Sequence, residues 1–219
     1  MDTNSNITVS CSKCSARTTV RAYRSINVAQ TPELKAKVKD GSLFIWECPH
    51  CGCRNLLRQE TLYHDPEQKL MVWVTCGNAL LEEKVQSSYG EVEELKDYTL
   101  RFVDDTGSLV EKVNIFDAGL DDMALELCKR VTKMELCEQL DEERAAAVLE
   151  APFKFLRTDG ADGEITFSYP LDGAMQVVAI GFNVYEDAAA ILSRHPQVKD
   201  GAPGFLRVDQ NWLAGIVSL

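Results

Sequence analysis

Two short cysteine motifs constrain this 219-residue chain more than any other feature of its sequence. Each motif holds two cysteines separated by two residues, and residues 15–47 lie between the motifs; the four cysteines are Cys11, Cys14, Cys48 and Cys51. Two intervening residues allow a tight turn to point both sulfur atoms at one ion, and two such turns supply the four thiolates of a structural zinc. The spacing therefore predicts that these four cysteines bind one zinc ion (Zn²⁺).

The two motifs differ in how well their sequences suit a tight turn. In the second motif, Pro49 restricts φ inside the turn, and Gly52 can take a positive φ just after the second cysteine. Ser15 stands at the position in the first motif that corresponds to Gly52. The first turn must therefore tolerate backbone strain or differ slightly in geometry. Cys53 is expected outside the ligand set, because a C-x-C pair suits one ion less well than a C-x-x-C pair.

A thiol-redox site is the main alternative for the second motif. Its sequence, Cys-Pro-His-Cys, follows the apolar run 43–46 and resembles the active-site motif of thioredoxin-like disulfide oxidants. That chemistry needs a helix that begins at the motif and lowers the pKa of the first thiol. Residues 52–55 look like a turn instead, and Cys11 and Cys14 have no role in such an enzyme. Cysteines that merely pack as small apolar residues are a further alternative, which the paired spacing opposes.

Composition favours a globular cytoplasmic protein. A content of 45% hydrophobic and 26% charged residues suits one or two domains, each with its own core. Residues 1–6 have neither the basic nor the apolar region of a secretory signal, and no apolar run reaches the roughly 20 residues of a membrane helix. In the cytoplasm thiols stay reduced, so a cysteine cluster more often binds metal than forms disulfides.

The formal net charge of −11 lies mostly in residues 76–150, which contain 19 acidic and eight basic residues. Nucleic-acid binding normally needs a positive surface, and only the first part of the chain offers one. Its basic residues are Lys13, Arg17, Arg21 and Arg24. This small cluster is more typical of a solvated strand face, so a nucleic-acid partner is not favoured. An acidic region beside a mildly basic one suits a protein partner or self-association.

Periodicity and turn residues predict an α+β fold. We expect an elaborated zinc ribbon with a small antiparallel sheet over residues 1–80, an acidic and mainly helical segment over 81–150, and an α+β C-terminal region over 151–219. The elements expected in the first half are a strand at 18–23, a helix from Pro32 with Thr31 as N-cap and Gly41 just past its end, a strand at 43–47, an extended stretch at 55–62, a turn at 64–67 and a strand at 70–74.

Further along, a strand at 100–103, a turn at 104–107 and a helix at 109–116 are expected. Asp121 then caps the clearest helix, whose apolar stripe indicates a core-facing surface; the stripe is Leu120, Met123, Ala124, Leu127, Cys128, Val131 and Met134. Cys128 is expected to pack there. The last part predicts strands at 153–156, 164–169 and 174–182, a helix at 185–193 that His195 ends, and a strand at 205–208. Residues 209–219 fit a helix or a strand equally.

The cysteine motifs and several later segments resemble the CpXC domain proteins, a family named for its paired cysteine motifs. The likeness covers residues 11–51 with Pro32–Leu34 and Asp40–Gly41, the segments Leu62–Pro66 and Leu70–Trp73, and Asn114–Asp122. The resemblance implies zinc binding by the four cysteines and no particular activity. Ser15 replaces the glycine that usually follows the first motif in this family.

Enzymatic activity has no support in the sequence, and no catalytic residue or organic cofactor site is predicted. The chain has no phosphate-binding glycine loop, nucleophile elbow or H-E-x-x-H motif. His64 could serve in acid–base chemistry or bind metal, but Asp65 and Pro66 favour a turn that it merely caps. The predicted function is a zinc-stabilised binding or adaptor protein. A thiol-redox protein and a nucleic-acid-associated zinc ribbon are the alternatives.

Overall fold

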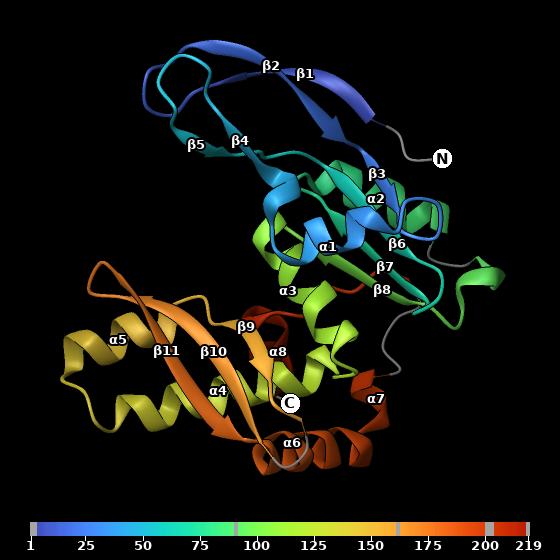
Figure 1. Cartoon of the computed structure of the whole chain (residues 1–219). Coiled ribbons are helices and arrows are strands. Elements are labelled where there is room, and N and C mark those ends of the chain that lie inside the picture. The colour runs from blue at the N-terminus through green and yellow to red at the C-terminus, as the bar shows by residue number, and fades with distance from the viewer. Residues whose placement is uncertain (1–3, 90–91, 161–162, 200–203, 218–219) are drawn as a thin grey trace. The chain divides into compact units, whose positions relative to one another are not determined.

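The computed structural model describes residues 4–89, 92–160, 163–199 and 204–217. Helices and several small sheets follow one another along the chain, which confirms the predicted α+β class (Figure 1). Contacts divide the chain into two compact units. Unit 1 comprises Met1–Val113 and Pro203–Arg207, and unit 2 comprises Asn114–Ala202 and Val208–Leu219. The division at residues 80 and 150 stays a prediction.

Unit 1 begins with two antiparallel hairpins. β1 (Asn4–Ser10) pairs with β2 (Arg17–Tyr23), and β4 (Ile45–Glu47) pairs with β5 (Arg54–Leu56). The innermost pairs are Ser10 with Arg17 and Glu47 with Arg54, so each connecting turn contains one cysteine motif. The strand predicted at 18–23 is therefore confirmed. Residues 52–55 do not begin a helix, because β5 starts at Arg54.

A four-stranded sheet in the order β3-β6-β7-β8 completes the framework of unit 1. Its strands are β3 (Ser25–Asn27), β6 (Thr61–Asp65), β7 (Leu70–Val74) and β8 (Thr99–Val103). The central hairpin of β6 and β7 is antiparallel, as predicted, whereas β3 and β8 each run parallel to their neighbour. The turn predicted at 64–67 is wrong by two residues: His64 and Asp65 extend β6, and the chain turns at 66–69.

Helix α1 (Glu33–Lys39) is confirmed, with Leu34 and Val38 buried. Gly41 follows its end with φ +74°, as predicted. The cap assigned to Thr31 is wrong, because Pro32 occupies the N-cap position and the Thr31 hydroxyl donates to the Asn27 carbonyl instead (3.2 Å).

The remaining short elements of unit 1 refine the predictions. A 3₁₀ turn, η1 (Ser42–Phe44), replaces the start of the strand predicted at 43–47. Helix α2 (Ala79–Tyr89) and the 3₁₀ turn η2 (Glu93–Leu95) precede β8. Strand β8 confirms the strand predicted at 100–103. Helix α3 (Thr106–Asp117) confirms the one expected at 109–116. It begins inside the turn expected at 104–107, because the Asp105 carboxylate accepts the Ser108 N–H (2.8 Å) at its start.

A short segment from near the C-terminus, 204–207, belongs to unit 1. Leu206 exchanges backbone hydrogen bonds with β8, since it donates to the Leu100 carbonyl and accepts from the Phe102 N–H, both at 3.1 Å. Phe205 stacks on Phe102 with ring centroids 4.9 Å apart. The strand predicted at 205–208 is thus reduced to a single bridge between Leu206 and Arg101.

Unit 2 combines helices with a three-stranded meander (Figure 1). Its strands are β9 (Lys154–Thr158), β10 (Glu164–Leu171) and β11 (Ala174–Gly181), in the order β11-β10-β9, which confirms the predicted meander. Its helices are α4 (Asp122–Cys137), α5 (Glu142–Glu150), α6 (Phe182–Arg194), α7 (Pro196–Lys199) and α8 (Gln210–Val217). The helix predicted at 185–193 lies within α6, His195 follows its last residue as predicted, and the undecided C-terminal segment is helical.

Helix α4 begins at Asp121 as predicted, since the Asp121 carboxylate accepts the N–H groups of Met123 and Ala124. The second half of its predicted apolar stripe is wrong, because Val131 and Met134 are exposed. Charged and polar side chains are buried there instead: Glu126, Lys129, Thr132 and Lys133. Glu126 and Lys129 neutralise each other in an ion pair (2.6 Å), so charge does not keep them at the surface.

Cys128 lies inside α4 and is fully buried, as predicted. Desolvation by burial raises the pKa of its thiol to about 12. The thiol is therefore neutral near pH 7, and packing accounts for this residue.

Candidate metal centre

The two cysteine turns have the same backbone geometry despite their different sequences. In the first turn the Ser15 N–H donates to the Cys11 carbonyl (3.0 Å), and in the second the Gly52 N–H donates to the Cys48 carbonyl (2.9 Å). Ser15 has φ +59° and Gly52 has φ +66°. A serine thus adopts the left-handed conformation that glycine adopts without strain. The first turn was expected either to tolerate backbone strain or to differ in geometry. It tolerates the strain and has the same geometry as the second turn.

All four predicted ligands come together at the ends of the two hairpins. Their sulfur atoms lie within 4.8 Å of one another, and two contacts join the two turns: Cys11 to Cys51 at 3.6 Å, and Cys14 to Cys48 at 3.7 Å. Cys11 and Cys48 are buried, whereas Cys14 is exposed and Cys51 is half-buried. This cluster of four cysteines could bind a metal ion.

Backbone N–H groups favour one thiolate in the cluster. The N–H of Cys14, with help from that of Lys13, lowers the pKa of Cys11 to about 6. The N–H of Cys53 also lowers the pKa of Cys51, but desolvation and the neighbouring sulfurs outweigh it and raise that pKa to about 12. Ionisation of one thiol thus makes the next more costly. A bound divalent cation would remove this repulsion and favour all four thiolates.

Asn55 links the two turns and was missed from the sequence. Its Oδ1 accepts both the backbone N–H and the hydroxyl of Ser12 at 2.8 Å, while its Nδ2 donates to the Cys53 carbonyl (2.8 Å) and to the Cys11 sulfur (3.7 Å). The side chain is nearly buried, with 8% exposed. Its position on β5, just past the second motif, gave no signal, because the contacts exist only once the hairpins are side by side.

Two other residues weighed from the sequence lie close to the cluster. Cys53 is not part of it, and its thiol faces the Arg54 carbonyl (3.6 Å). His50 is exposed inside the second turn. Neither side chain is placed to complete the set of four sulfurs.

His64 lies apart from the cysteines, on β6 of the sheet. Its Nδ1 is 3.5 Å from the Asn27 Nδ2, and its Nε2 is 3.4 Å from the Tyr98 hydroxyl. Because Asn27 Oδ1 accepts the Ala29 N–H (3.1 Å), its amide group directs Nδ2 toward the imidazole, which must accept at Nδ1. Desolvation lowers the pKa of His64, and the nearby Asp65 carboxylate opposes that shift. The neutral ring therefore joins β3 to the residue before β8.

Asp65 is held by several donors at the end of β6. Its buried carboxylate, 2% exposed, accepts from the Lys35 ammonium (3.0 Å), the Tyr63 hydroxyl (3.4 Å) and the Gln68 N–H (3.2 Å). Lys35 belongs to α1, so this ion pair ties the helix to the sheet. Asp65 therefore has a structural role at the end of β6, directly before the turn at 66–69.

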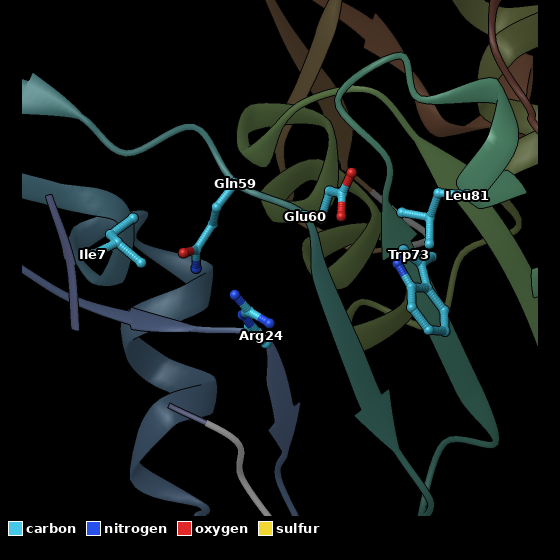
Figure 2. Close-up of a pocket in the computed structure, with 6 residues that line it drawn as sticks. All are labelled: Ile7, Arg24, Gln59, Glu60, Trp73 and Leu81. Atoms are coloured by element: carbon cyan, nitrogen blue, oxygen red, sulfur yellow. The ribbon is translucent and has the colours of Figure 1, made fainter. Parts of the chain in front are cut away.

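A pocket of about 330 Å³ lies beside the first hairpin (Figure 2). Its apolar lining comes from Ile7, Trp73 and Leu81, and its polar lining from Arg24, Gln59 and Glu60. Two polar groups are fixed: the Gln59 amide donates to the Tyr23 carbonyl (2.8 Å) and the Glu60 carboxylate accepts from Asn78 (2.7 Å). These residues are widely spaced in the sequence, so no local pattern could have predicted the pocket.

Two hairpins that bring four cysteines together define a ribbon-type protein with a candidate metal centre. A family model described as CpXC protein matches residues 9–129, more than half of the chain. The chain therefore belongs to the CpXC family, which confirms the resemblance seen in its sequence. No curated protein and no solved structure matches it. Among the described residues, no helix combines the length and apolar character needed to span a membrane.

Proposed function

We propose that the chain is a zinc-stabilised binding protein, in which Cys11, Cys14, Cys48 and Cys51 hold one structural zinc ion. The observation that carries the proposal is the meeting of four sulfurs from two turns of the same shape, all within 4.8 Å. Four thiolates in this arrangement suit zinc, which prefers tetrahedral sulfur coordination and closes a structural site without an open position.

Metal analysis of the purified chain tests the zinc site. We expect about one zinc per chain, little or none in Cys48→Ser, and unchanged zinc in Cys53→Ser. The second variant is a matched control, because Cys53 is a neighbouring thiol outside the cluster. Folded, fully reduced wild-type protein without any metal would contradict the proposal.

A thiol-redox function at Cys48 and Cys51 is the second candidate, and the fold gives it less support. In thioredoxin-like sites a helix that begins at the motif lowers the pKa of the first cysteine, whereas β5 follows this motif. Cys48 is also only 1% exposed. Metal-free protein with a reducible disulfide between Cys48 and Cys51 would favour this function over zinc binding.

The pocket beside the first hairpin supports the binding part of the proposal. It combines an exposed guanidinium, from Arg24, with the apolar surfaces of Trp73 and Leu81. A protein segment with an acidic and an apolar side chain fits this lining.

Co-purification tests this surface. We expect proteins that co-purify with the wild type to be lost with Arg24→Glu and retained with Arg130→Glu, which changes an exposed arginine of unit 2. Equal retention by both variants would place the binding surface elsewhere.

A further inference from the structure

The two edges of the meander in unit 2 differ in how they are protected. At one edge, β9 carries Lys154 and Arg157, and a bulge interrupts its pairing with β10. At the other edge, β11 (Ala174–Gly181) spans eight residues without a charge, a proline or a bulge. Charges and bulges are the usual devices that stop an edge strand from pairing with another chain. β11 lacks them all.

The register of the hairpin shows which backbone groups of β11 are open. A two-residue turn, Asp172-Gly173 with φ +54° and +73°, joins β10 to β11, so Leu171 and Ala174 form a hydrogen-bonded pair. Even-numbered residues of β11 therefore bond to β10, and odd-numbered ones direct N–H and C=O groups outward. Among the described strands, β11 pairs with β10 alone. The open groups belong to Met175, Val177 and Ala179.

The side chains of this edge are apolar and unusually exposed. Met175 is 62% exposed and Val177 is 63% exposed, on the same face of the strand. A strand with open backbone groups and exposed apolar side chains gains both hydrogen bonds and apolar burial when a further strand is added. It therefore has the properties of an association surface.

We propose that this surface binds a second copy of the chain, with β11 antiparallel to β11 across a two-fold axis at Val177. This register pairs Val177 with itself and Met175 with Ala179, so about six backbone hydrogen bonds can form between the copies. The contact is self-complementary, as a two-fold interface requires. The three-stranded sheets of the two copies then join into one continuous sheet.

Charge at the contact itself does not oppose a second copy. The formal charge of −11 on each chain causes a general repulsion between two copies, but β11 carries no charged side chain, so no carboxylates face each other along the paired strands. Just beyond the paired strands, the same register brings Asp172, which forms an ion pair with Arg144 of its own chain (2.8 Å), near Phe182, the first residue of α6 in the other copy. That helix has no side-chain cap at its start, and a carboxylate near a helix N-terminus is stabilising. This inference does not depend on the zinc site, which belongs to unit 1.

Sedimentation equilibrium on the zinc-loaded, reduced chain tests the pairing. The wild type is expected to be a dimer, and Val177→Lys and Val177→Glu should each weaken self-association about 100-fold, because like charges meet on the axis. Mixing the two variants should restore a one-to-one dimer, since the charges are then opposite. Leu80→Lys, at an even more exposed apolar residue, in α2 (78%), should remain dimeric.

Restoration in the mixture separates the proposal from misfolding, since misfolded variants would not pair. A monomeric wild type overturns the proposal, and so do dimers that persist in both Val177 variants. A mixture that stays monomeric, or open-ended association of the wild type, overturns the two-fold register.

Discussion

Ser15 shows how a single residue can be strained by the geometry of a site. Its left-handed φ of +59° matches that of Gly52 in the second turn, and a left-handed conformation costs an L-residue about 1–2 kcal/mol. Ser15→Gly removes this strain but adds about 0.4–1 kcal/mol of entropy to the unfolded chain. We expect a net gain of about 0.5–1 kcal/mol in the free energy of unfolding, measured with denaturant at saturating zinc.

The corresponding change in the second turn is the control for Ser15. Gly52→Ser introduces the strain that Ser15→Gly relieves, so it should lower the free energy of unfolding by a similar amount. Destabilisation by both substitutions would show that Ser15 is not strained in the folded protein.

Asn55 forms hydrogen bonds to both turns of the candidate metal site. Removing a group that orients metal ligands typically weakens metal binding about 10–100-fold. Asn55→Ala should therefore lower zinc affinity by that factor, measured by competition with a chromophoric chelator. Asn78→Ala is the control, because that amide binds the Glu60 carboxylate at the surface. Equal affinity of the Asn55 variant and the wild type would contradict this role.

His64 makes stability depend on pH. Desolvation lowers its pKa in the folded state below the unfolded value of about 6.5, so the unfolded chain binds more protons when pH falls below that value. Folding stability contributed by the neutral ring is thus present above about pH 6.5 and is lost as pH falls toward the folded pKa. Protonation at Nδ1 would also oppose the donor of Asn27.

The measurement compares the wild type with His64→Gln at several pH values from about 7 down to about 5. The free energy of unfolding of the wild type should fall more steeply with acidification. Protonation of the cysteines affects both proteins equally, so their difference isolates His64. Parallel curves would show that His64 does not titrate differently on folding.

At the scale of elements, the segment 204–207 behaves as part of the sheet although it is distant in sequence. Phe205, 7% exposed, stacks on Phe102 and meets Trp73 edge-on at 6.3 Å. Phe205→Ala should therefore lower the free energy of unfolding by about 3–5 kcal/mol. Denaturant unfolding followed by tryptophan fluorescence measures this change. Leu80→Ala, at an exposed site of α2, should cost less than about 0.5 kcal/mol, and equal costs would show that the segment is not docked.

Local sequence patterns predicted the elements that depend on neighbouring residues. The hairpin of β6 and β7, the meander of unit 2 and the Asp121 cap follow from alternation, turn residues and capping chemistry, and the paired spacing identified the cysteines that meet. Predictions failed where distant residues decide. Helix α4 buries Lys129 because Glu126 forms an ion pair with it. Residues 205–208 form a single bridge, between Leu206 and Arg101 of β8.

For the whole molecule, the cysteine hairpins of unit 1 and the meander of unit 2 are stabilised by different means. Unit 2 has an apolar core of its own, with Ile165 and Phe167 of β10 fully buried. In unit 1 the second hairpin is short, since β4 and β5 have three residues each, and a short isolated hairpin is marginal in water. The cysteine cluster and the hydrogen bonds between Asn55 and Ser12 join it to the first hairpin.

Removing the metal should therefore unfold the hairpins and spare the meander. Zinc bound by thiolates contributes about 10–16 kcal/mol in small modules, which is comparable to the whole stability of a domain, about 5–15 kcal/mol. After treatment with a chelator, hydrogen exchange should accelerate by orders of magnitude in β1, β2, β4 and β5 and change little in β10. Cys48→Ser should give the same pattern without chelator, and Cys53→Ser should resemble the wild type. Uniform acceleration across both units would show that the metal stabilises the entire chain. Unchanged exchange in β1, β2, β4 and β5 would show that the metal does not stabilise the hairpins.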